Sequence, residues 1–146
     1  MVSLGEFARR IRLRGRQSEE GINRIVREVA LVADREVVMQ TPVDTGRARS
    51  NWLLSLGGPS GAEIAAYAEG KKGSTSGANS RAAMEQAKTA VAARQPEQDI
   101  YISNNLPYIG LLNDGSSAQA PAGFVQAAVK RAASAVRLRR VFRNGD

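Results

Sequence analysis

The stretch Thr41-Pro42-Val43-Asp44-Thr45-Gly46-Arg47 divides the first half of the chain into a helical part and an extended part. Upstream of it, apolar residues recur at helical spacing from Ile22 to Val37, with Asp34 and several arginines off the apolar stripe. Pro42 disfavours helical backbone at the residue before it, so the helix is predicted to end there. Asp44 and Gly46 are typical turn residues, and glycine readily adopts a positive φ. The stretch therefore predicts a sharp reversal from a long helix into a strand.

The whole chain, residues 1–146, is predicted to form a single α+β domain. Residues 1–17 are expected to be a basic N-terminal arm or a short helix that starts with the Ser3-Leu4-Gly5-Glu6 capping box and is interrupted at Gly15. In that helix Leu4, Phe7, Ala8 and Ile11 share one face. Residues 18–138 form the predicted body and residues 139–146 a basic C-terminal tail.

The body is predicted to combine the long N-terminal helix with a small antiparallel sheet, two further helices and flexible glycine-rich loops. Trp52, in the first strand, is interpreted as a core residue, with a partner-binding anchor as the alternative. The predicted elements are a strand or extended segment at Arg47–Leu56, a returning strand at Ala62–Ala68 with a helix as the alternative, a strand at Asp99–Asn104, a mobile loop at 70–80, helices at Arg81–Arg94 and Ala122–Arg137, and a turn at Asp114–Gly115. The last helix is expected to face inward with Phe124, Val125, Ala128, Val129, Ala132 and Val136.

The charge is concentrated at the two ends of the chain. Lys and Arg total 21 against 14 Asp and Glu, for a net charge of +7. Arginine's planar fork favours carboxylate or phosphate partners, so both ends are candidate binding segments, with solvated basic termini as the alternative. The basic clusters are Arg9, Arg10, Arg12, Arg14 and Arg16 near the start, and Lys130, Arg131, Arg137, Arg139, Arg140 and Arg143 near the end.

The composition excludes several kinds of catalytic site. The chain has no histidine and no cysteine, which removes Ser-His-Asp and Cys-His catalysis and any metal site that needs nitrogen or sulfur ligands. A two-carboxylate site built from Asp44, Asp99 and Asp114 is a minor alternative. We therefore expect no enzyme activity and no cofactor. No apolar run is long enough to predict a membrane span, and the absence of cysteine suits a reducing cytoplasm.

A second stretch, from Leu112-Asn113-Asp114-Gly115-Ser116-Ser117 through Ala120-Pro121 to Phe124, accompanies the first one. Together with Thr41–Arg47, Trp52 and Tyr108, and over roughly Ile22 to Val136, it resembles the small minor tail or neck proteins of siphophages, which include tail-component and head–tail joining proteins. The resemblance implies a virion protein, assembled in the bacterial cytoplasm, that forms a ring of identical subunits where the connector meets the tail tube. It also implies the connector and tail-tube proteins as partners, and no membrane.

The residues themselves suit a subunit of such a ring, because head-to-tail contacts require two different faces on each copy. The arginines could contact acidic neighbours or DNA in the channel. A plain helix-to-strand turn at Asp44–Arg47 stays open, as do a tail terminator at the adjacent ring and a basic nucleic-acid-binding module. The candidate interface residues are Arg9, Arg10, Arg12, Arg14, Arg16, Asp44, Thr45, Gly46, Arg47, Asn113, Asp114, Gly115, Arg137, Arg139 and Arg140.

Overall fold

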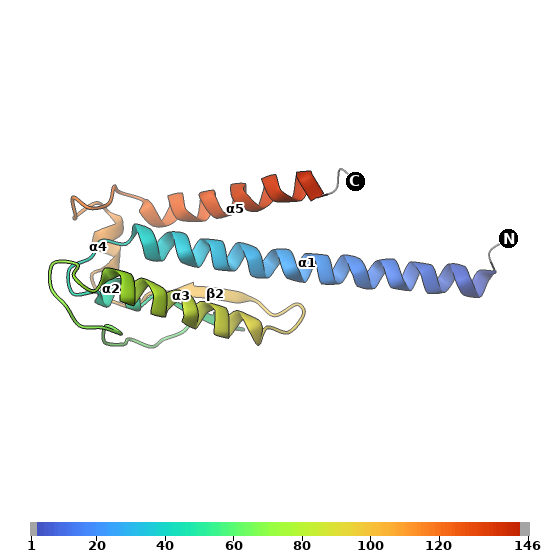
Figure 1. Cartoon of the computed structure of the whole chain (residues 1–146), viewed down its shortest axis with the longest axis horizontal. Coiled ribbons are helices and arrows are strands. Elements are labelled where there is room, and N and C mark those ends of the chain that lie inside the picture. Colours follow the sequence, from blue (N-terminus) through green and yellow to red (C-terminus); the bar gives the residue numbers. More distant parts are fainter. Residues whose placement is uncertain (1–2, 144–146) are drawn as a thin grey trace.

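The protein has the α+β architecture that the sequence predicts, with one long helix, a two-stranded antiparallel sheet and further helices. The computed structural model describes residues 3–143, and the side chains of residues 3–135. In Figure 1, α1 lies in the middle, α5 runs along one side of it, and α3 and the sheet lie along the other. The elements are α1 (Leu4–Gln40), α2 (Arg47–Ser50), β1 (Leu53–Leu56), α3 (Ser76–Ala92), β2 (Ile100–Ser103), α4 (Ile109–Asn113) and α5 (Phe124–Arg143).

The first helix is longer than predicted. Its capping box is present, with the Ser3 hydroxyl accepting from the Glu6 amide at 3.2 Å. The predicted interruption at Gly15 is wrong, because glycine lowers helix stability by only about 1 kcal/mol relative to alanine and α1 continues through it. The helix ends at Gln40, and Thr41 is extended (ψ 127°), as expected before Pro42.

The segment after the turn is only partly a strand. Residues 47–50 form the short helix α2, stabilised where the Ser50 hydroxyl donates to the Gly46 carbonyl, and β1 starts at Leu53. The strand pairs with β2 in antiparallel register, with Leu54 opposite Ile102. The predicted strand at Arg47–Leu56 is therefore wrong in its first half and correct in its second.

The predicted returning strand at Ala62–Ala68 is not formed. The backbone groups of Leu54 that point away from β2 bond to the Gln86 side chain, so that edge of β1 is already occupied. Residues 62–68 run beside α2 without regular secondary structure. The predicted loop at 70–80 is also shorter than expected, since α3 begins at Ser76 rather than Arg81. Asn79 anchors that extra turn by bonding to the Thr75 carbonyl.

The second half of the chain adds a five-residue helix, α4, that was not predicted. The last helix starts at Phe124 because Gly123 before it has a positive φ of +77°, and its backbone continues to Arg143, beyond the predicted end at Arg137. Residues 139–143, predicted as tail, are thus helical, and 144–146 lie outside the described residues.

The core lies where α1 meets the other elements, and Trp52 is part of it, as predicted. Its indole donates to the Thr41 hydroxyl at 2.7 Å. On α5 a narrow stripe of Phe124, Ala128 and Ala132 is buried, whereas Val129, predicted to face inward, is 54% exposed. The stripe assigned to the core on α1 is also partly wrong, because Ile22 is exposed and Asp34, expected off the stripe, is buried.

Candidate assembly surfaces

The predicted turn at Pro42–Arg47 is a tightly fixed structure at one end of the body. Gly46 has φ +86°, in the left-handed region that favours glycine. A Cβ at this position would lie 2.8 Å from Cγ of Asn79, so the neighbouring amide also requires a glycine. Asp44 does not bond within its own turn. Its side chain accepts from the Lys72 amide at 2.8 Å and so holds the 71–73 loop.

The two sequence stretches meet in space. The side-chain oxygen of Gln119 accepts from the Val43 amide at 2.9 Å, and its nitrogen donates to the Val43 carbonyl at 3.1 Å. Beside this contact is an open hollow of about 360 Å³, lined by residues of both stretches and by Tyr108. The hollow brings together Asp44, Thr45 and Gly46 from the first stretch with Leu112, Ser117 and Gln119 from the second.

The predicted trio Asn113, Asp114 and Gly115 has a different place. Asn113 accepts from the Gly123 amide through its carbonyl, at 2.6 Å, and from the Val125 amide through its side chain, at 3.0 Å. It therefore closes the turn that leads into α5. Gly115 has φ +92° and Asp114 is exposed at the end of α4. These residues shape the chain reversal and do not line the hollow.

Side-chain amides replace strand pairing at four places in this end of the molecule. In each, one Asn or Gln accepts from the N–H and donates to the C=O of a single residue, because an amide side chain carries its acceptor and its donor on two neighbouring atoms. We call these contacts amide clamps. They are Asn51 on Ile64, Asn79 on Ala68, Gln86 on Leu54 and Gln119 on Val43.

No local pattern in the sequence predicts these clamps. Each one joins residues 11 to 76 positions apart, and Asn79 lies in a stretch that reads as low-complexity loop. Two of the clamping amides, Asn51 and Asn79, are completely buried. A buried polar group must be paired, so these amides are structural requirements of the fold.

A second hollow, of about 450 Å³, lies on the other side of the turn, between Thr45 and the 63–70 segment. Arg47, predicted at an interface, forms an ion pair with Glu63 at its edge and donates to the Ile64 carbonyl. Both side chains are exposed, so the pair adds little stability. The pKa of nearby Tyr108 is raised overall, mainly by burial. The positive charge of Arg47 lowers this pKa and the negative charge of Glu63 raises it further.

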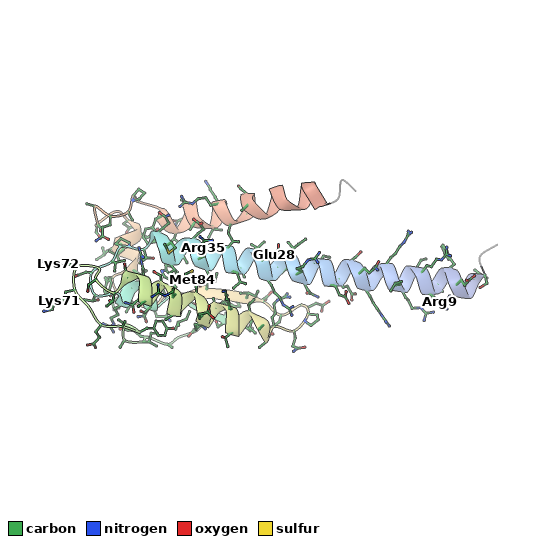
Figure 2. All side chains as sticks on the ribbon, viewed as in Figure 1. Arg9, Glu28, Arg35, Lys71, Lys72 and Met84 are labelled. Carbon is green, nitrogen blue, oxygen red and sulfur yellow. The ribbon has the colours of Figure 1, made fainter. Side chains whose placement is uncertain are left out.

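The arginine-rich segment lies at the opposite end. All side chains from Arg9 to Glu20 are exposed, and Figure 1 shows this part of α1 extending well beyond the body. Figure 2 places Arg9 at that end and Lys71 and Lys72 at the other. At 1.5 Å per residue, Arg9 lies about 45 Å along α1 from the turn. Arg137, Arg139 and Arg140 lie on the backbone of α5, but their side chains are outside the described residues.

The charge follows this division. Residues 3–16 carry five arginines and one glutamate, a net +4, whereas residues 17–135 contain twelve basic and twelve acidic side chains. Residues 17–135 are therefore neutral as a whole and the projecting part of α1 is strongly basic, while Arg137, Arg139, Arg140 and Arg143 add four positive charges at the end of α5. The structure separates a neutral turn end from a cationic arm.

The carboxylates of the minor catalytic alternative are not all together. Asp44 lines the hollow at the turn, whereas Asp99 lines a groove between α1 and β2. Among the described side chains, no three acidic residues gather in a group that could hold a metal ion. Asp34, on α1, is a buried carboxylate whose two oxygens have no hydrogen-bond partner. Its burial raises the pKa of this group to about 7.

No protein family, curated protein or solved structure was found to match this chain. Within the described part of the chain, none of the helices combines the length and the apolar character that crossing a bilayer requires.

Proposed function

We propose that this chain is a structural virion protein of a tailed phage. In this proposal it forms a ring of identical subunits in the head–tail neck or tail-completion region and joins the connector to the tail tube. The observation that carries the proposal is the division of the molecule into a rigid turn end and a projecting arginine arm about 45 Å away. The role needs no chemistry, and we propose no enzymatic activity and no cofactor.

The turn end supplies a surface for neighbouring subunits. Its two stretches are held together by Gln119 on Val43, and the hollow beside this clamp has exposed Asp44, Thr45 and Tyr108 at its edge. A preformed surface of this kind loses little conformational entropy when another protein binds. Ring contacts are head-to-tail, so a second, different face of the next copy would cover it.

The arm supplies reach and charge. Residues 4–20 extend about 25 Å along the helix axis, enough to contact a protein above or below the subunit's own ring. Its arginines could bind acidic patches on the connector or tail-tube protein. They could also contact the phosphates of DNA in the channel without reading its sequence.

Immunogold electron microscopy provides the direct test. Antibodies raised against the chain are applied to tailed particles released from the cells that carry the gene. We expect gold at the head–tail junction, and negative staining of the purified protein is expected to show rings. Purified particles that lack the chain by mass spectrometry would overturn the virion proposal.

The exposed arginine helix favours one alternative, a basic nucleic-acid-binding module. That function predicts that the chain is absent from particles and that it binds duplex DNA with an affinity that falls steeply as salt increases. Replacing all five arm arginines by glutamine would then abolish binding. In the virion proposal the same variant folds but is no longer incorporated.

A further inference from the structure

A stripe of apolar and small residues runs along the N-terminal two thirds of α1, exposed from Leu4 to Ile22 and half-buried at Ile25 and Val29. Leu4 is 88% exposed, and Phe7, Ile11 and Ile22 are each 55–56% exposed. At 100° per residue, the stripe stays within about 80° around the helix axis. It consists of Leu4, Phe7, Ile11, Gly15, Ser18, Ile22, Ile25 and Val29.

This stripe requires a partner. Residues 9–20 are exposed on every side, and an isolated helix of that length is only marginally stable in water. Large apolar side chains at regular spacing along such a helix are typical of a surface that another helix covers. The small residues Gly15 and Ser18, at its middle, allow close approach of a second helix.

The stripe has an internal symmetry that identifies the partner. Counting outward from the midpoint between Arg16 and Gln17, Leu4, Ile11 and Gly15 each have an apolar or small counterpart at the same distance on the other side. The counterpart of Phe7 is Ile25, which lies one position nearer to the midpoint. A second α1, placed antiparallel with the two midpoints together, therefore brings apolar residues opposite apolar residues along about 39 Å. The facing pairs are Leu4 with Val29, Phe7 with Ile25, Ile11 with Ile22, and Gly15 with Ser18.

We propose that the N-terminal part of α1 docks antiparallel on α1 of a second copy of this chain. The receiving half already has a groove of about 440 Å³ between α1 and β2. Its apolar walls are Ile25, Val26, Val29, Ile100 and Ile102. The antiparallel arrangement directs the first turns of the second helix, which carry Leu4 and Phe7, to this groove. Because the arrangement is two-fold symmetric, each copy fills the other's groove.

The charges beside the stripe agree with this arrangement. Arg12 and Glu19 flank the stripe on the same side, and in the antiparallel pair each Arg12 comes within one helical turn of Glu19 of the other copy. Arg9 and Arg16 lie on the opposite face of the helix, so they stay exposed. A parallel pair would instead place Phe7 against Phe7 and leave both grooves empty.

Two substitutions with equal starting exposure test the proposal. Ile11 and Leu13 are both 55% exposed on the same helix, but only Ile11 belongs to the stripe. Sedimentation equilibrium of the full chain should show the dimer as the smallest associated species. Ile11→Glu should raise the dissociation constant by about 100-fold or more, because two buried isoleucines are lost per dimer. Leu13→Glu should leave it unchanged. Wild-type protein that stays monomeric at high concentration, or equal effects of the two variants, would overturn the proposal.

Disulfide trapping tests the direction of the pair. The chain has no cysteine, so each introduced one is unique. A mixture of Ile11→Cys and Ile22→Cys proteins should form a mixed disulfide rapidly. Ile11→Cys alone should not form a disulfide, because the introduced cysteines of the two copies lie about 16 Å apart along the helix axis. Rapid self-linking of Ile11→Cys without mixed product would contradict the antiparallel pair. Both tests use purified protein, so their outcome does not depend on whether the chain is found in virions.

Discussion

Gly46 is the position where a single methyl group should have the largest effect on the fold. In Gly46→Ala the backbone stays in the left-handed region, which costs an L-residue about 1–2 kcal/mol. The added Cβ also displaces the side chain of Asn79, a completely buried amide that clamps Ala68. Disturbing those buried hydrogen bonds costs about 1–3 kcal/mol more. We therefore expect a total loss of about 2–5 kcal/mol in the free energy of unfolding.

Gly21→Ala is the matched control. Gly21 is within α1, and a Cβ there meets no atom within 4 Å. The same change should therefore stabilise the helix by up to about 1 kcal/mol. Urea unfolding followed by circular dichroism measures both variants. Two variants of equal stability, or a Gly46→Ala protein within about 0.5 kcal/mol of wild type, would refute the account of the turn.

Three further predictions concern the clamps, the buried carboxyl and the arm. Asn79→Asp removes the donor that bonds to the Ala68 and Thr75 carbonyls, so it should lower the free energy of unfolding by about 3 kcal/mol or more. Gln119→Glu changes an exposed clamp and should lower it by less than about 1.5 kcal/mol. Urea unfolding measures both variants. Burial raises the pKa of Asp34 from 3.8 to about 7. Between pH 3.8 and about 7 the Asp34 carboxyl is therefore protonated in the native state and ionised in the unfolded state. Stability from this group is then full below pH 4, falls by up to about 4 kcal/mol as pH rises to 7, and the fall should be absent in Asp34→Asn when unfolding is measured across that range. Replacing the five arm arginines by glutamine should lower the urea midpoint only slightly, since those side chains are exposed and the proposed Arg12–Glu19 contact is a surface ion pair. A large shift would show that the arm belongs to the folded core.

The sequence predicted those features that depend on neighbouring residues. Pro42 and the Ser3–Glu6 capping box act on backbone within a few positions, so the end and the start of α1 were both predictable. The positive φ of Gly46 was anticipated for the same reason, because few other residues tolerate it. The meeting of the two stretches was not, since it depends on Gln119 reaching a backbone 76 positions away.

The errors share a physical cause. The strand predicted at Ala62–Ala68 has the right alternation, but side-chain amides took the places that a neighbouring strand would fill. Likewise, Asn79 reads as a loop residue until its bonds to Ala68 and Thr75 are known. Asp34 lies off the apolar stripe in the sequence pattern, yet it is buried without a hydrogen-bond partner. Tertiary contacts decided each of these positions, and local pattern carries no information about them.

The proposed pairing of α1 and the proposed role in a phage neck use different faces of the same helix. The stripe through Ile11 and Ile22 would be covered in the pair, while Arg9 and Arg16, on the opposite face, remain exposed. Pairing would therefore hold the arm helical without consuming the charges that reach a neighbouring protein or DNA. It would also bring the arginines of two arms onto one rod, which increases the local positive charge and with it the salt dependence of any polyanion contact. On this reasoning, Ile11→Glu should weaken binding to a polyanion more than Leu13→Glu does, because both variants add one negative charge but only Ile11→Glu breaks the pair.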